Sequence, residues 1–154
     1  MKTMILMAVA ILLTGCVTIE NTYSMDKEGN IMHELSMQFE DAYTHAMMAD
    51  ELPTEKLVKV NSTSRTYRQT ESGTFNGSMQ SGLVFNTYQF NTEYLYSIED
   101  YDELGPYVEG QSIISMPGKV TGHNCKQTSR NTIQCELFGD ELIQIESRCI
   151  KWFC

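Results

Sequence analysis

Residues 17–39 read VTIENTYSMDKEGNIMHELSMQF, and this stretch decides the fold. Apolar and polar residues alternate from Val17 onward, and five alternating residues share one face within the segment 31–39. This alternation is typical of β-strands, in which successive side chains point to opposite faces. Residues 28–30 between the two runs are turn formers. The stretch therefore predicts a β-hairpin, with His33 as a strand residue at the edge of the core and not a metal ligand.

The period of the pattern changes after this hairpin. Asp41 can cap a helix that continues through Leu52 and ends at Pro53. Residues 54–60, TEKLVKV, fit a second short helix or the next strand, and periodicity does not separate the two. Residues 88–101 fit a long strand, or a helix capped by Asn91.

The rest of the chain reads as strands joined by turns. Ser, Thr, Gly and Asn are frequent between residues 62 and 87, and the turns Gly105-Pro106 and Pro117-Gly118 flank a strand in QSIISM. Two more strands follow, in NTIQCEL and ELIQIESRCIKWF. The expected fold class is therefore α+β: an antiparallel β-rich sheet with one or two short helices packed on it.

The residues before the hairpin have the features of an export signal. Lys2 precedes an apolar run of about ten residues, which is half of what a membrane-spanning helix needs. Residues 13–16, Leu-Thr-Gly-Cys, resemble the lipobox of bacterial lipoproteins. That resemblance implies cleavage before Cys16 and a diacylglycerol on its sulfur, so residues 1–15 are expected to be a signal peptide and 16–154 one envelope domain. A secretory signal cut elsewhere would instead leave Cys16 as an unpaired thiol.

The balance of charge restricts the partners. The whole chain has a formal charge of −9, and removal of Lys2 with the signal makes the expected mature domain more acidic still. An acidic domain without a basic stripe repels nucleic acid and anionic lipid headgroups, so no nucleic-acid partner is expected. The N-terminal lipid makes the membrane the expected partner.

Four cysteines remain beyond Cys16, and an even number in an exported domain indicates disulfides. Pairing Cys125 with Cys135 and Cys149 with Cys154 is favoured because each pair is close in sequence. Closing these two loops would contribute roughly 2.8 and 2.2 kcal/mol. Neither the spacing nor the nearby histidines favour zinc, and no metal or other cofactor is expected.

A second resemblance extends into the domain. The segments ISMPGKVTGHN (114–124) and NTIQCEL (131–137), with the opening hairpin from Cys16 to Phe39, look like the LppM-type lipoprotein domain. The resemblance implies an envelope domain with a β-rich sheet packed by helix, and an apolar pocket for lipid-like molecules. It brings no catalytic residues with it.

The sequence contains no complete phosphate-binding, calcium-binding or catalytic motif of the common types. The segment PGKVT is not a phosphate loop, because Ile113 stands where that motif needs glycine and Val120 where it needs Ser or Thr. The segment from Asp100 is not a calcium loop, because Pro106 follows its glycine and Gln111 replaces the glutamate ligand. No nucleophile elbow or zinc-protease helix is present, so the chain is not expected to be an enzyme. The methionines of the mature chain could bind Cu(I), but they are better explained as core packing.

One aromatic set remains as a candidate binding surface. Tyr88, Phe90, Tyr94 and Tyr96 share one parity, and tyrosines often line pockets. The first hypothesis is therefore a non-catalytic lipoprotein that binds an apolar or lipid-like ligand, or an envelope protein, against its sheet. The second is a structural or assembly subunit of an envelope complex, or a phage-borne surface-exclusion lipoprotein. A pocket lined by the tyrosines favours the first, and a solid core with an exposed apolar patch favours the second.

The expected location follows from the anchor. Val17 and Thr18 follow Cys16 without the aspartate that marks retention in the inner membrane of many enteric lipoproteins. The bacterial cell envelope is expected, on the periplasmic side of the outer membrane if the cell has one.

Overall fold

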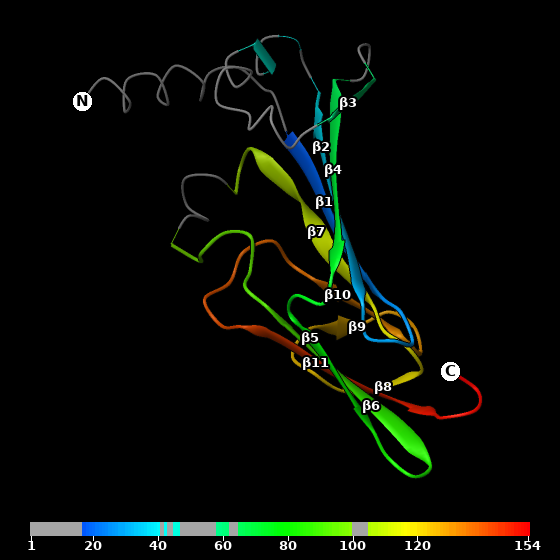
Figure 1. The fold of residues 1–154 in the computed structure, drawn as a ribbon. Helices are drawn as coiled ribbons and strands as arrows, with labels where there is room; N and C mark the ends of the chain where they lie inside the picture. The colour runs from blue at the N-terminus through cyan, green and yellow to red at the C-terminus, as the bar shows by residue number, and fades with distance from the viewer. Residues whose placement is uncertain (1–16, 41, 43–44, 47–57, 62–64, 100–104) are drawn as a thin grey trace.

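A computed structural model describes residues 17–40, 42, 45–46, 58–61, 65–99 and 105–154. The described residues form eleven β-strands in two sheets (Figure 1). The strands are β1 (Val17–Met25), β2 (Ile31–Phe39), β3 (Val58–Asn61), β4 (Thr66–Gly73), β5 (Gly77–Ser81), β6 (Phe85–Thr92), β7 (Val108–Ser115), β8 (Lys119–His123), β9 (Lys126–Gln127), β10 (Thr132–Cys135) and β11 (Ile143–Ile150).

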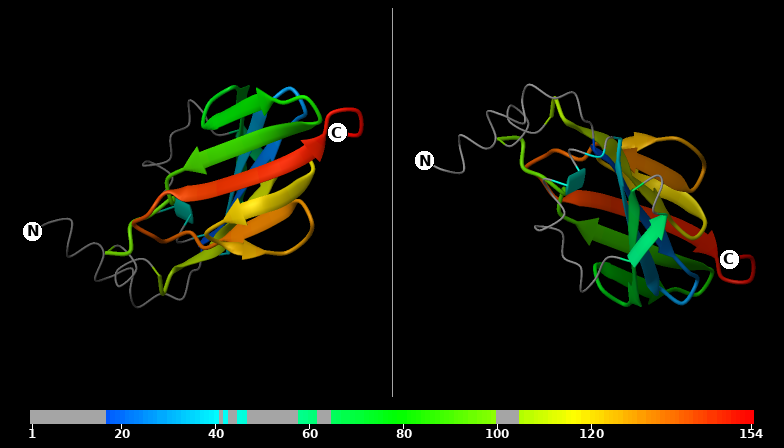
Figure 2. Two further views of the ribbon diagram at one scale, coloured as in Figure 1. Left: turned by 90° about the horizontal axis from the view of Figure 1, so that it is seen from below. Right: turned by 90° about the horizontal axis from the view of Figure 1, so that it is seen from above.

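The larger sheet has seven strands in the order β3-β4-β2-β1-β7-β10-β9, and the smaller sheet has four in the order β5-β6-β11-β8. The strands of the smaller sheet cross those of the larger one at a steep angle (Figure 2). Every hydrogen-bonded pair of these strands is antiparallel except β1 with β7, which is parallel.

The expected α+β class is therefore wrong, because the described part of the chain is mostly strand and contains no complete helix; only residues 42 and 45–46 are helical. The prediction of helices packed on one sheet fails for a physical reason. A second sheet, whose strands β6 and β11 each have one buried face, covers the face that helices were expected to cover. The prediction of an antiparallel sheet holds for all pairs but β1 with β7.

The opening hairpin is confirmed. Val17 pairs with Phe39 and Met25 with Ile31, so the two strands are in full register. The carboxylate of Asp26 closes the turn by accepting hydrogen bonds from the backbone N–H groups of Glu28 at 3.0 Å and Asn30 at 2.8 Å. The side chain of Asn30 also donates to this carboxylate, at 2.9 Å. This side-chain bond first, and then the backbone bonds, lower the pKa of Asp26.

The structure bears differently on the three segments for which the sequence predicted a helix or left helix and strand open, residues 41–53, 54–60 and 88–101. The helix from Asp41 to Leu52 lies almost entirely outside the described residues. The end of segment 54–60 is a strand, since β3 begins at Val58. In segment 88–101 the strand β6 ends at Thr92, and Asn91 donates its backbone N–H to the oxygen of Asn76 instead of capping a helix. Pairing with β5 and β11 on both sides has overridden the local helical pattern.

The parallel contact between β1 and β7 depends on a glycine. Gly110 has φ of +147°, and a Cβ there would lie 1.8 Å from the carbonyl oxygen of Ile19. Only glycine permits this backbone conformation and this approach of the two chains. This pairing joins β1 to a strand more than 80 residues later in the chain. It places β1 in the middle of the larger sheet, between β2 and β7.

The core consists of two groups of buried side chains. The first lies between the two sheets and includes Ile31, Tyr88, Phe90, Ile114 and Ile133. The second, formed by Val17, Ile19, Phe39, Tyr67 and Leu137, lies toward the start of β1. Both groups combine residues distant in sequence, so strand pairing and core formation depend on each other.

Candidate functional site

The aromatic set proposed from sequence does not form one surface. Tyr88 and Phe90 are 0% exposed and belong to the core between the sheets. The Tyr88 hydroxyl donates to the backbone oxygen of Lys27 at 2.9 Å, and the ring of Phe90 lies 5.0 Å from that of Tyr23. Both side chains therefore join the two sheets and do not face a solvent-filled pocket.

Tyr94 and Tyr96 lie beyond the end of β6 and diverge from the other two. Tyr94 packs beside Gly139 and is partly buried against the core, and burial, with Glu136 and Glu141, raises the pKa of its hydroxyl. Tyr96 stacks on Phe138 with ring centroids 5.3 Å apart. Because the strand ends at Thr92, the shared parity of the four residues does not extend to Tyr94 and Tyr96. The structure thus corrects the interpretation of these residues as one ligand-binding stripe.

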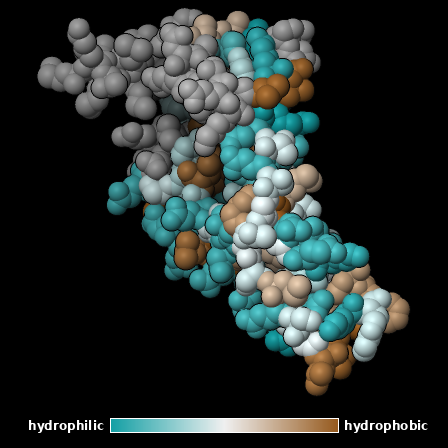
Figure 3. All heavy atoms as spheres, viewed as in Figure 1, coloured by the Kyte–Doolittle hydropathy of each residue, from teal (hydrophilic) through white to brown (hydrophobic). Residues whose placement is uncertain are grey.

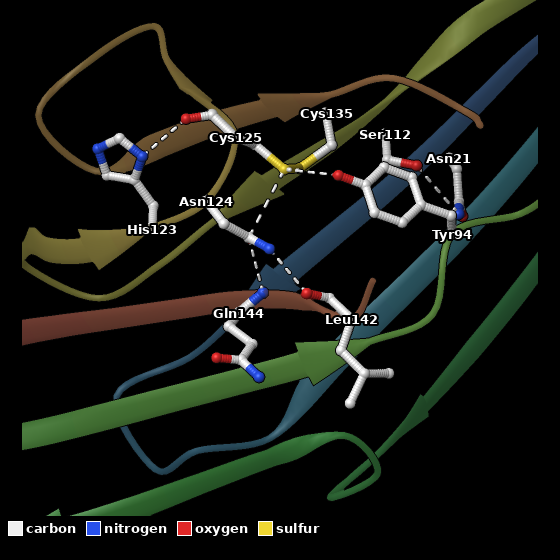
Figure 4. Close-up of a disulfide and its surroundings, with 9 residues drawn as sticks. All are labelled: Asn21, Tyr94, Ser112, His123, Asn124, Cys125, Cys135, Leu142 and Gln144. Atoms are coloured by element: carbon white, nitrogen blue, oxygen red, sulfur yellow. Dashed lines mark hydrogen bonds between the residues drawn. A yellow bond between two sulfur atoms is a disulfide. The ribbon is translucent and has the colours of Figure 1, made fainter. Parts of the chain in front are cut away.

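The four C-terminal cysteines are joined in the two pairs favoured by their spacing, Cys125 with Cys135 and Cys149 with Cys154. The first disulfide joins the two strands of the β9–β10 hairpin in the larger sheet, since Cys125 directly precedes β9 and Cys135 ends β10 (Figure 4). The hydroxyl of Tyr94 donates to the sulfur of Cys125 at 3.7 Å. This bridge therefore fixes the β9–β10 hairpin next to the segment in which the chain passes from β8 of the smaller sheet to β9 of the larger one.

Asn124 fixes the segment next to this bridge. Its side-chain N–H donates to the oxygen of Leu142 at 2.7 Å, and its side-chain oxygen accepts from the backbone N–H of Gln144 at 2.9 Å (Figure 4). Nδ1 of His123 donates to the oxygen of Cys125 at 2.7 Å. The side chains of His123 and Asn124 are thus both hydrogen-bonded to backbone atoms, and they stabilise the segment beside the disulfide.

His33 is part of a polar group within the larger sheet. Its Nε2 donates to the side-chain oxygen of Asn21 at 2.5 Å, and Asn21 in turn donates to Tyr23 at 3.3 Å and to Ser112 at 3.5 Å. The His33 ring stacks on Tyr23 with centroids 4.4 Å apart. Burial lowers the pKa of His33, against the opposing effect of Glu71 on the neighbouring strand. The expectation of a strand residue at the core edge is met.

Two depressions lie on the outer side of the smaller sheet. One of ≈ 470 Å³ is lined mainly by polar side chains such as Gln89, Gln144 and Glu146, and the other, of ≈ 360 Å³, lies beside Asn76 and Thr92. None of the four aromatic residues of the predicted set lines either depression. Both are open to solvent and lined mainly by residues with polar side chains, and neither is an enclosed apolar pocket for a lipid-like molecule.

The described residues contain no group of three His, Cys, Asp or Glu side chains that could hold a metal ion. They also contain no helix with the length and apolar character needed to cross a bilayer. Cys16, the proposed lipid site, lies outside the described residues.

The sequence reasoning missed a group of exposed apolar side chains where β6 begins and β11 ends. These strand ends lie far from the start of β1 (Figure 1), and apolar atoms are visible at this end of the molecule (Figure 3). We call this group the apolar tip. Its members are Leu83, Val84, Phe85, Ile150, Trp152 and Phe153. The runs LVF and WF in the sequence were a signal for it, but only the pairing of β6 with β11 brings them together.

No protein-family model matches the chain, and no curated protein is similar to it. Among solved structures, the chain is similar to the folded domain of LppM from Mycobacterium tuberculosis, determined by NMR. The match covers 90% of this chain and 92% of that one, with 9% sequence identity and a TM-score of 0.49. At this level of similarity the match assigns neither a family nor a function.

Proposed function

We propose that this chain is a non-catalytic lipoprotein of the bacterial cell envelope, anchored by diacylglycerol on Cys16, which acts through its surface as a structural or assembly component. The observation that carries the proposal is the position of β1. Val17, the residue after the lipobox cysteine, is 5% exposed, and its backbone N–H donates to the oxygen of Tyr107 at 2.8 Å. A lipid on Cys16 would hold the paired sheet directly at the bilayer, without a linker.

The core supports a surface role over that of a ligand carrier. In the described part of the chain, Tyr88 and Phe90 fill the space between the sheets, and the two depressions outside are lined mainly by polar residues. A carrier of an apolar ligand needs an apolar cavity. The exposed apolar tip instead supports a function that depends on contact with another surface.

The residues directly after Cys16 support a location at the outer membrane. Val17 and Thr18 lack the aspartate of inner-membrane retention, so in a cell with two membranes we place the protein on the periplasmic side of the outer membrane. Fractionation of the two membranes on a density gradient tests this placement.

Metabolic labelling with palmitate tests the anchor. We expect the wild-type chain to carry label and a Cys16→Ser variant to carry none and to keep its signal peptide. The variant Cys149→Ser/Cys154→Ser is the matched control, because it removes two cysteines of the domain and should be labelled like the wild type. Equal labelling of wild type and Cys16→Ser would refute lipidation at Cys16.

Native mass spectrometry after extraction in mild detergent separates the surface role from that of a carrier. We expect the lipidated chain alone, or the chain bound to a protein of the envelope. A stoichiometric lipid that stays bound in addition to the covalent one would contradict the surface role.

A further inference from the structure

The apolar tip is exposed to an unusual degree for large apolar side chains. Leu83 is 93% exposed, Phe153 83% and Trp152 73%, while Val84, Phe85 and Ile150 are each about half exposed. Single exposed apolar residues need no explanation, but a contiguous group at one end of a domain marks a contact surface.

The backbone holds the two halves of the tip together. Phe85 of β6 is paired with Ile150 of β11, and the N–H of Lys151 donates to the oxygen of Val84 at 2.9 Å. The disulfide from Cys149 to Cys154 closes the loop that carries Trp152 and Phe153. These side chains are therefore presented on a fixed loop, which reduces the entropy lost when they bind.

The charges next to the tip oppose those of the chain as a whole. The chain has a formal charge of −9, yet residues 72–92, 110–135 and 147–154 contain no Asp or Glu. These three stretches include β5, β6 and β8, most of the smaller sheet, together with the C-terminal loop.

Basic side chains lie in this acid-free region. Lys119 of β8 is the register partner of Arg148, which lies two residues before Ile150 on β11 and is exposed on the same face. Lys151 follows at the tip itself. Glu146 on the same face forms an ion pair with Arg148 at 3.2 Å. A row of basic residues thus borders the apolar tip.

We infer that the apolar tip and its basic border bind the anionic surface of the bilayer that holds the lipid anchor, so that the domain lies along the membrane with both ends in contact. Tryptophan and phenylalanine are suited to the region between headgroups and acyl chains, and Lys and Arg are attracted to anionic headgroups. The inference rests on the proposed anchoring, because a tethered domain keeps its tip at high effective concentration near the surface.

The shape of the tip favours a bilayer over a protein partner. Leu83, Trp152 and Phe153 protrude from a turn and a loop, and no tip residue lines either of the two depressions. A protruding group of apolar side chains inserts into a fluid interface without a preformed groove, whereas a protein partner would have to supply that groove.

Trp152 is the only tryptophan of the chain, so its fluorescence reports on the tip alone. The lipidated full chain would be reconstituted into vesicles of phosphatidylcholine with brominated phosphatidylglycerol, or of brominated phosphatidylcholine alone. We expect emission at shorter wavelength and strong quenching in the anionic vesicles, weak quenching in the zwitterionic ones, and loss of quenching at high salt.

Two pairs of variants separate the tip from the rest of the surface. Lys119→Gln/Lys151→Gln should weaken the contact roughly 30-fold, since each lysine near an anionic surface contributes about a fivefold change. Lys59→Gln/Lys126→Gln removes the same charge from strands away from the tip and should be quenched like the wild type. Leu83→Ser/Phe153→Ser should also lose quenching, whereas Val58→Ser/Ile98→Ser, which changes exposed apolar residues elsewhere, should not.

Several outcomes would overturn the inference. Absence of quenching in anionic vesicles would do so, and so would equal quenching in the two double-lysine variants. A shift of the Trp152 emission wavelength that depends on protein concentration in detergent would assign the tip to contact with a second copy of the chain. Shielding of Trp152 from acrylamide in native membranes without quenching by lipid would assign it to a protein partner. Flotation of the protein with vesicles tests the anchor separately. A protein that floats while its Trp152 fluorescence is not quenched refutes only the tip contact. A protein that carries no palmitate and is still quenched refutes only the anchor.

Discussion

Replacement of Phe90 by alanine tests whether the aromatic residues of β6 form core or line a pocket. The Phe90 side chain is 0% exposed and contacts the opposite sheet through Tyr23. Its register partners are Gly77 on one side and Ile145 on the other, so neighbouring strands cannot easily close the space left by its ring. Buried Phe→Ala substitutions cost about 3–5 kcal/mol, from lost burial and from the cavity that remains.

Phe85 is the matched control, because it lies on the same strand, points to the opposite face and is 49% exposed. Phe85→Ala should lower the free energy of unfolding by about 1 kcal/mol or less. A loss of about 3–5 kcal/mol is a large fraction of the roughly 5–15 kcal/mol typical of a domain. The Phe90→Ala protein should therefore be only marginally folded.

Guanidinium unfolding of the oxidised protein, followed by far-UV circular dichroism, measures both variants. The core interpretation requires the transition midpoint to fall much further for Phe90→Ala than for Phe85→Ala. Equal midpoints would refute it. A Phe90→Ala protein that is as stable as the wild type, but has lost a bound lipid, would restore the pocket interpretation.

Three further predictions concern the backbone, a disulfide and a titrating side chain. Gly110→Ala should prevent folding to soluble protein, with a cost above about 4 kcal/mol, because its Cβ would lie 1.8 Å from a backbone oxygen of β1. Cys149→Ser/Cys154→Ser should lower the unfolding free energy by about 2 kcal/mol, since it opens a short loop, and should leave the strands intact by circular dichroism. His33 has a lowered pKa in the folded protein, so the unfolded state binds its proton more readily, and stability should fall as the pH drops below the ordinary value of 6.5. His33→Gln should flatten this part of the stability profile, measured by denaturant unfolding between neutral and mildly acidic pH.

Each of these has a control or a contrary result. Gly122→Ala adds a Cβ at 3.6 Å from its nearest neighbour, an ordinary contact, and should fold normally. If Gly110→Ala folded equally well, the close pairing of β1 with β7 would be wrong. Unchanged stability of the cysteine variant would show that the second bridge does not constrain the unfolded chain. A His33→Gln protein with the same pH profile as the wild type would assign the pH dependence to other groups.

The sequence was informative wherever structure depends on neighbours along the chain. Alternation and a turn segment predicted the opening hairpin, because a short turn leaves its two strands little choice of register. The spacing of the four cysteines favoured the pairings that the structure contains, since short loops close at low entropic cost. These are local effects, and they remain visible without a fold.

The errors arose where distant segments meet. The parity of residues 88–96 predicted one surface, but the strand ends at Thr92, so Tyr88 and Phe90 entered the core while Tyr94 and Tyr96 packed elsewhere. The same alternation fits a strand covered by helices or by a second sheet, and the fold class was therefore wrong. Nothing local to residues 108–115 indicated that they pair in parallel with the first strand.

By itself, the sequence determined the alternation of the strands, the turn of the first hairpin and an acidic chain with two long acid-free stretches. Only the tertiary structure decided which face of each strand is buried, and only the pairing of β6 with β11 assembled the apolar tip beside its basic row. The physical reason is that local propensities depend on a few adjacent residues. Burial and surface patches depend instead on which strands pair across long loops, and that is set by packing of the whole domain.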